Sequence, residues 1–156
     1  MYRKFQKFDV MIKVKIFNAV NLPTTIEKES LIDFLFVNLE QYGDPKQDIE
    51  KAINYALKEI PSFGGFVLAA YQDDKLVGEV VVNETGMEGY IPENILVYIA
   101  THKEYRGKGI GKLLLSKTIE NTQGSIALHV EPDNPARFLY EKMGFTSKYI
   151  EMRLKK

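Results

Sequence analysis

The amino-acid sequence predicts an α/β fold in which a mixed sheet is packed between helices, and two observations support that prediction. Apolar residues recur at helical spacing between residues 24 and 60, whereas short apolar runs typical of strands fill residues 66–100. Between residues 95 and 130, a strand, a crossover helix and a second strand follow one another, an order that makes the two strands parallel neighbours. At 156 residues, the chain is long enough for one domain, 1–156, and short for two. The role of residues 1–10, an N-terminal extension, is left open.

The composition excludes several classes of function. Lysine plus arginine and aspartate plus glutamate balance at 21 each, which argues against a general nucleic-acid or membrane-surface partner. Because the chain has no cysteine, thiolate chemistry is excluded, and its two histidines leave little for a metal site, so no metal is expected. The first ten residues lead into no apolar segment long enough for a signal peptide or a membrane helix, and we therefore expect a cytoplasmic protein.

A strand and a helix are predicted first. Residues Ile12–Ile16 alternate apolar and charged side chains, as in a half-buried strand. Thr24 and Glu27 have the spacing of a capping box, which begins a helix, and Gly43 ends that helix. The predicted inner face of the helix consists of Leu31, Ile32, Leu35, Phe36 and Leu39.

A second helix is predicted between Asp44 and Pro61. Asp44 is a suitable N-cap, Pro45 suits the first helical position, and Gln47 stands three residues after the cap. Pro61 stops the helix because a proline cannot continue it. Its predicted inner face consists of Ile49, Ile53, Ala56, Leu57 and Ile60.

A hairpin and a buried strand come next. The apolar runs Phe66–Tyr71 and Leu76–Val82 flank an Asp73-Asp74 turn, which is typical of two paired antiparallel strands. Residues 83–90 are interrupted by glycines and predict a flexible connection. Residues Ile95–Ala100 are apolar without alternation, so this strand is expected in the middle of the sheet with both faces covered.

The last part of the chain alternates helices and strands. A helix is predicted from Gly109 to Asn121, followed by a strand from Ile126 to Val130. Asn134-Pro135 has the pattern of a helix cap and a first-position proline, which begins a short helix, Ala136–Met143. Residues Phe145–Leu154 are predicted to form the last strand.

The loop Tyr105–Lys112 carries three alternate glycines between basic residues. Glycine tolerates positive φ and lets a ligand approach the main chain, and the helix that begins here leaves its first N–H groups without intrahelical partners. This pattern favours binding of a phosphate group, with a glycine-rich turn on a basic helix end as the alternative. The glycine spacing fits neither a Walker loop nor a dinucleotide fingerprint, so nucleotide hydrolysis is not expected. The nearby cations are Lys103, Arg106, Lys108 and Lys112.

Two motifs resemble those of the GNAT superfamily of N-acyltransferases. Arg106-Gly107-Lys108-Gly109-Ile110-Gly111 is similar to the superfamily's Arg/Gln-x-x-Gly-x-Gly/Ala acyl-CoA signature, and Asn134–Phe145 looks like its second motif. Matching element order extends from about Ile12 to Leu154, although the specific motifs cover only Ile95–Phe145. The resemblance implies a GNAT-like mixed, mostly antiparallel sheet with a splayed central parallel pair, flanked by helices.

The resemblance also implies acetyl-CoA as the co-substrate. The backbone N–H groups of the glycine loop would hold the pyrophosphate, and the pantetheine arm would pair with the splayed strand as an added strand. A main-chain N–H of that strand would polarise the thioester carbonyl, as an oxyanion hole does. A plain core strand is the alternative for the strand residues, and a helix cap is the alternative for Asn134. The implied cofactor-binding residues are Ile99, Ala100, Thr101, Arg106, Gly107, Lys108, Gly109, Ile110, Gly111, Lys112 and Asn134.

Tyr140 matches the superfamily's general acid. A phenol, with an ordinary pKa of about 10, is protonated at neutral pH and can donate to sulfur, and a core aromatic is the alternative reading of the residue. The identity of the general base stays open. His129 aligns with one position that the superfamily uses, Glu93 and Glu79 are alternatives, and a structural histidine is equally compatible with the sequence.

The implied reaction transfers an acetyl group from acetyl-CoA to a primary amine of a small molecule or a peptide. The acidic connection with Glu84, Glu88 and Glu93 favours a cationic acceptor, with a solvated acidic loop as the alternative. A non-catalytic acyl-CoA-binding or sensing module, and a protein-interaction domain without CoA, are the rival functions. The oligomeric state, including a homodimer, stays open, because exposed aromatic residues would suit an acceptor pocket or a partner surface. Examples of these aromatic residues are Tyr42, Tyr55 and Phe63.

Overall fold

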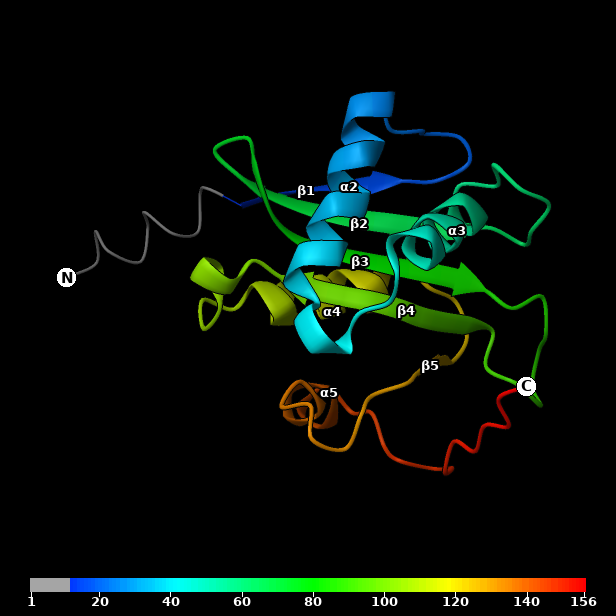
Figure 1. Cartoon of the computed structure of the whole chain (residues 1–156). Helices are drawn as coiled ribbons and strands as arrows, with labels where there is room; N and C mark the ends of the chain where they lie inside the picture. The colour runs from blue at the N-terminus through cyan, green and yellow to red at the C-terminus, as the bar shows by residue number, and fades with distance from the viewer. Residues whose placement is uncertain (1–11) are drawn as a thin grey trace.

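The computed structural model describes residues 12–156, which form a five-stranded sheet with helices on both faces (Figure 1). The strands lie in chain order, β1 to β4 are antiparallel to one another, and β4 pairs with β5 in parallel. This confirms the predicted mixed, mostly antiparallel sheet with a parallel pair. The N-terminal extension, residues 1–10, lies outside the described residues. The elements are β1 (Ile12–Phe17), α2 (Thr25–Asn38), η1 (Glu40–Tyr42), α3 (Lys46–Ala56), β2 (Gly65–Gln72), β3 (Lys75–Glu84), β4 (Asn94–Thr101), η2 (Lys103–Tyr105), α4 (Ile110–Glu120), β5 (Ile126–Leu128) and α5 (Arg137–Lys142).

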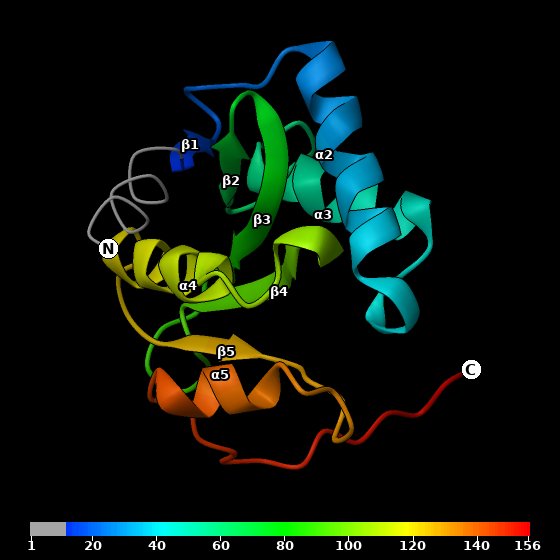
Figure 2. The same cartoon turned by 90° about the vertical axis from the view of Figure 1, so that its left-hand side faces the viewer.

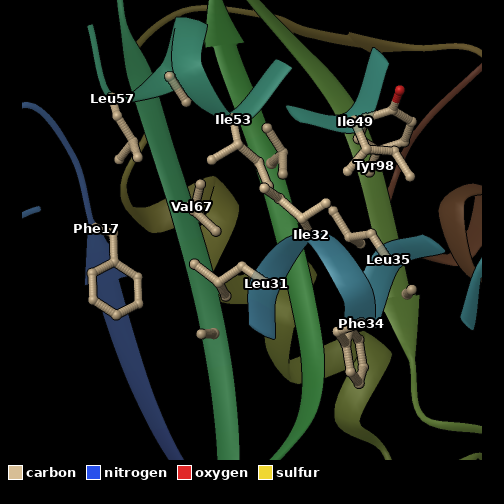
Figure 3. Packing of buried hydrophobic residues seen from close by; sticks show 14 residues of the cluster. Phe17, Leu31, Ile32, Phe34, Leu35, Ile49, Ile53, Leu57, Val67 and Tyr98 are labelled. Atoms are coloured by element: carbon tan, nitrogen blue, oxygen red, sulfur yellow. The ribbon is translucent and has the colours of Figure 1, made fainter. Parts of the chain in front are cut away.

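Two apolar layers hold the sheet between its helices. Helices α2 and α3 cover one face, and α4 covers the other, as the side view shows (Figure 2). Figure 3 shows Leu31 of α2 and Ile53 of α3 close to Val67 of β2 in the same apolar layer. Each of these side chains is fully buried and stabilises the fold by roughly 1.5–3 kcal/mol through the hydrophobic effect. No helix within residues 12–156 has the length and apolar character needed to cross a membrane.

The start of α2 follows the sequence prediction closely. Thr24 Oγ1 accepts a hydrogen bond from the N–H of Glu27 at 3.1 Å, and Glu27 Oε1 accepts one from the N–H of Thr24 at 2.9 Å, so the capping box is confirmed. The predicted inner face is wrong at Phe36, whose side chain is 49% exposed, while Phe34 is buried instead. Phe34 packs in the same apolar layer as Leu31 and Leu35, and the helical spacing of apolar residues alone does not distinguish Phe34 from Phe36.

The start of α3 differs from the prediction. The N-cap is Pro45, which forms no side-chain cap, and Asp44 Oδ2 instead accepts a hydrogen bond from the hydroxyl of Tyr98 at 2.6 Å. The helix also ends earlier than predicted, at Ala56, because Lys58 adopts a positive φ of 55°. Ile60 therefore lies beyond the helix and is 40% exposed.

The predicted last strand, Phe145–Leu154, is wrong. Residues 145–156 contain no strand, and β5 is the edge of the described sheet, so the parallel pair lies at one side of the sheet instead of its centre. A strand requires a neighbouring edge as well as an alternating pattern, and β5 offers only three residues for pairing. The side chains of Tyr149, Ile150, Met152 and Leu154 are consequently 80–89% exposed.

Candidate functional site

A split between β4 and β5 is the main opening in the sheet. The two strands pair only over three residues, from Asn94↔Ile126 to Leu96↔Leu128, although β4 continues to Thr101. At the point where pairing stops, the β3–β4 register jumps from Val82↔Leu96 to Val81↔Tyr98, which leaves Val97 as a bulge. Beyond the bulge, one edge of β4 has lost its neighbour.

The unpaired edge of β4 presents main-chain groups to this split. The N–H of His102 donates to Val77 O of β3 at 2.8 Å, and hydrogen-bonding directions alternate along an antiparallel strand. The main-chain N–H and C=O of Ala100 are therefore directed towards β3, whereas those of Ile99 and Thr101 are directed away from it. These groups can pair with an extended ligand arm, as an added strand would.

The glycine loop lies at the end of this free edge and leads into α4. Gly107 has a φ of 77°, and Gly109, the N-cap of α4, has a φ of 83°, conformations that favour glycine. A Cβ placed on either residue would meet nothing within 4 Å, so the space above this helix end is open. The unpartnered N–H groups of the first turn and the helix dipole make it suitable for an anion.

Gly111 has a different role from the two glycines before it. A Cβ there would lie 3.0 Å from Leu139 Cδ2, so Gly111 leaves room for the Leu139 side chain of α5. Gly78 of β3 acts similarly, because its Cβ would lie 2.8 Å from both Ile110 and Leu114. The two glycines thus bring the start of α4 close to the sheet and leave room for Leu139.

The predicted cations of the loop do not all point into open space. Arg106 Nη2 pairs with Glu40 Oε1 at 2.8 Å and donates to Asn38 O at 3.2 Å, which ties the loop to the end of α2. Lys108 Nζ lies 4.9 Å from the centroid of the Tyr105 ring, over its face. Lys103 and Lys112 are exposed, and their charges favour an anion at this end of the split.

Tyr140 reaches the same region from α5. Its side chain is 7% exposed and belongs to the apolar layer that includes Ile110, Ile99 and Tyr105. Burial raises the pKa of Tyr140 to about 12, so its hydroxyl stays protonated at neutral pH. Asn134 Oδ1 accepts a hydrogen bond from the N–H of Ala136 at 2.9 Å, which is a local turn contact before α5.

The three predicted candidates for the general base lie in three different environments. His129 follows β5 directly and is exposed where the two strands have separated. Glu93 precedes β4, at the opposite end from the glycine loop, and its carboxylate accepts hydrogen bonds from Gly89 N at 2.8 Å and Ser125 N at 2.7 Å. These backbone bonds lower the pKa of Glu93, which favours a structural role. Glu79 is fully buried under the α2 layer.

The sequence reasoning missed the contacts of the loop between α2 and α3. The sequence predicts Asp44 as a helix cap, but Asp44 accepts the Tyr98 hydrogen bond instead, and Tyr42 Oη donates to Asp133 O at 3.3 Å. A tyrosine within the otherwise aliphatic run Ile95–Ala100 was the one available signal, since a buried phenol requires a polar partner. Within residues 12–156, no three acidic or histidine side chains gather as they would around a metal ion.

Several solved structures share this fold across nearly the whole chain. A GNAT family acetyltransferase from Streptococcus pneumoniae is 18% identical, with a TM-score of 0.67, 94% of this chain covered and 98% of the other. An aminoglycoside acetyltransferase from an uncultured soil metagenomic sample, in complex with sisomicin, is 19% identical, with a TM-score of 0.63 and coverages of 96% and 97%. A transcriptional regulator from Bacillus halodurans is 20% identical, with a TM-score of 0.66 and coverages of 92% and 100%. At such identities the likeness establishes the fold alone.

The family is established by a match to the sequence and not by the structural likeness. The profile of the acetyltransferase (GNAT) domain matches residues 63–147, which is more than half of the 156-residue chain. The matched segment runs from β2 to the end of α5 and contains the split, the glycine loop and Tyr140. The chain therefore belongs to the GNAT acetyltransferase family.

Proposed function

We propose that this chain is an N-acetyltransferase that moves an acetyl group from acetyl-CoA directly to a primary amine. The single observation that supports it best is the free edge of β4, which ends at a glycine-lined helix N-terminus with open space above it. A cofactor with a pyrophosphate and an extended arm needs both features in this order. The family's use of acetyl-CoA supplies the acetyl group as a thioester.

The residues present fit this co-substrate. The N–H groups from Gly107 to Lys112 would hold the pyrophosphate, helped by the charge of Lys108 and by Arg106, whose pairing with Glu40 ties the loop to α2. Ile99, Ala100 and Thr101 would lie along the pantetheine arm, with the outward peptide groups of Ile99 and Thr101 pairing with it. Ile110 and Gly111 form the first turn of α4, and Asn134, whose Oδ1 accepts a hydrogen bond from the N–H of Ala136, would contact the cofactor arm from the turn before α5.

In the proposed reaction, the carbon–sulfur bond of the thioester breaks and a carbon–nitrogen bond to the acceptor forms. The amine loses one proton, and the departing sulfur gains one. Tyr140 would donate to the sulfur, since its hydroxyl is protonated throughout the neutral range. His129 is the favoured proton acceptor because it is exposed at the split, whereas Glu93 is engaged by two backbone N–H groups.

A substitution in the glycine loop tests this function at the level of binding. Gly109→Ala is expected to weaken acetyl-CoA binding about tenfold or more, because alanine disfavours the left-handed cap and its Cβ enters the open space above α4. Isothermal titration calorimetry with acetyl-CoA measures this effect.

Gly89→Ala is the matched control. Gly89 has a similar φ of 81° and equally open surroundings, but it lies in the β3–β4 connection, away from the glycine loop. We expect this variant to bind acetyl-CoA like the original chain. Equal losses in both variants, or no binding by the original chain, would reject the proposed acetyl-CoA site.

A further inference from the structure

A cavity of about 250 Å³ lies at the C-terminal end of α4. The helix has 11 residues, so this end is about 16 Å from the glycine loop at its start. The cavity is therefore separate from the proposed acetyl-CoA site. Within residues 12–156, its lining consists of Phe66, Glu84, Asn94, Asn121, Thr122 and Gln123.

The sheet supplies three neighbouring side chains to this cavity. Glu84 of β3 is the direct cross-strand partner of Asn94 of β4, and Phe66 of β2 lies opposite Val82 of β3. Side chains two residues apart on a strand share one face, so Glu84 lies on the same face as Val82, which packs in the α4 layer with Phe66. The carboxylate of Glu84 and the amide of Asn94 therefore line the cavity side by side, next to an apolar ring.

Asn94 is the buried polar residue of the cavity, and it is only 4% exposed. Its Nδ2 donates to Gln123 O at 2.6 Å and to Ser125 O at 3.3 Å. These two carbonyls fix the amide, because the opposite orientation would place Oδ1 against both of them. Oδ1 accepts no hydrogen bond within residues 12–156. Because a buried acceptor without a donor is costly, a molecule in the cavity that donates to Oδ1 would be stabilised.

The charge of the cavity favours a cation. Glu84 is exposed, and no lysine or arginine within residues 12–156 lines the cavity. The C-terminal end of a helix also carries a partial negative charge. The nearby donors are already engaged, since Asn121 Nδ2 donates to Lys117 O at 2.7 Å and Thr122 Oγ1 donates to Thr118 O at 2.9 Å. The cavity thus offers a ligand mainly acceptors and a negative charge.

We propose that this cavity binds a small organic cation through its N–H groups, with Glu84 providing the opposite charge and Asn94 Oδ1 the fixed acceptor. The ligand class is a guanidinium or ammonium compound smaller than a drug-sized ligand, because drug-sized ligands occupy roughly 300–1,000 Å³. Phe66 provides the apolar wall against which such a cation can pack. The inference does not depend on acetyl transfer, since neither Glu84 nor Asn94 belongs to the proposed acetyl-CoA site.

Two-dimensional NMR of the full ¹⁵N-labelled chain, titrated with methylguanidinium, tests the inference and locates the bound cation. We expect saturable shifts of the Asn94 side-chain amide and of the main-chain signals of residues 121–123. Methylurea has a similar shape and N–H donors but no charge, and tetramethylammonium has the charge but no N–H donor. Each should bind about tenfold more weakly than methylguanidinium, because the charge-assisted hydrogen bond is lost.

A pair of variants separates the role of Glu84 from a general effect of acidic residues. Glu84→Gln removes the charge, keeps the length of an exposed side chain, and should weaken methylguanidinium binding about tenfold. Glu88→Gln removes an exposed acid of the same β3–β4 connection that does not line the cavity, and it should bind like the original chain.

Several results would overturn the inference. These are the absence of saturable shifts, shifts confined to the glycine loop and the split, equal affinity for methylguanidinium and either of the other two probes, and equal behaviour of the two variants. The titration needs neither acetyl-CoA nor turnover. A chain that binds methylguanidinium as expected but acetylates no amine would therefore contradict the proposed function and leave the cation site standing.

Discussion

Replacing Tyr140 with phenylalanine is expected to lower turnover about 10²-fold while leaving acetyl-CoA affinity nearly unchanged. The ring is 7% exposed and packs 6.0 Å from the Phe145 ring, centroid to centroid, so phenylalanine preserves the packing and removes only the hydroxyl. Without that hydroxyl, the departing sulfur has lost its proposed proton donor. Thiol release under saturating acetyl-CoA and calorimetry of acetyl-CoA binding measure the two quantities separately.

Tyr149→Phe provides the control for the loss of a tyrosine hydroxyl. Tyr149 lies in the segment after α5 and is 80% exposed, so its substitution should change neither turnover nor binding. Burial raises the pKa of Tyr140 to about 12, and turnover should consequently show no loss from deprotonation of this residue between pH 7 and about 10. Unchanged turnover in Tyr140→Phe would remove the residue from the mechanism.

Glu79→Gln is expected to stabilise the protein at neutral pH and to remove a steep pH dependence. Glu79 is 0% exposed, both of its carboxylate oxygens lack a hydrogen-bond partner, and its cross-strand neighbours are Ala69 and Ala100. Burial raises the pKa of Glu79 well above its ordinary value of 4.5, because an unpaired charge is costly in an apolar layer. The folded state therefore holds a proton that the unfolded state releases.

The sign of the pH effect follows from this difference. A raised folded-state pKa gives stability that is fully present below the unfolded pKa, near 4.5, and is lost as the pH rises towards the folded pKa. Over that window, the free energy of unfolding should fall by up to about 1.4 kcal/mol per pH unit from this group alone. Glutamine needs no proton, so Glu79→Gln should lack this contribution.

Urea unfolding at several pH values above 4.5 measures the difference between the two proteins. The difference in unfolding free energy should grow with pH in favour of Glu79→Gln, whereas Glu29→Gln, at an exposed position of α2, should run parallel to the original chain. Turnover should be retained in Glu79→Gln, since the side chain has no access to solvent. Parallel stability curves would contradict the account of Glu79, and lost turnover would make it the general base.

Features that depend on neighbouring residues could be predicted from the sequence. The capping box at Thr24 and Glu27 forms as expected because both partners lie within one turn of helix. The hairpin around Asp73 and Asp74 also follows its local pattern, with both residues at positive φ. The strand–helix–strand unit that carries the glycine loop is parallel, as its length requires.

Features that depend on distant parts of the chain could not be predicted in the same way. Asp44 has the sequence position of a helix cap, but its partner, Tyr98, is 54 residues away. The segment after α5 alternates apolar and polar residues as a strand does. A strand also needs a neighbouring strand to pair with, and the three residues of β5 are too few to provide one. Glu79 stands in an apolar run whose burial is decided by α2, a helix more than 40 residues earlier.

The most direct test of the central claim is to measure CoA thiol and acetylated amine together after mixing the protein with acetyl-CoA and a panel of primary amines. We predict that at least one amine gives thiol and acetyl amide in equal amounts, and that Tyr140→Phe slows both about 10²-fold. Acetyl-CoA binding without thiol release on any amine would contradict an N-acetyltransferase and favour an acyl-CoA-binding module.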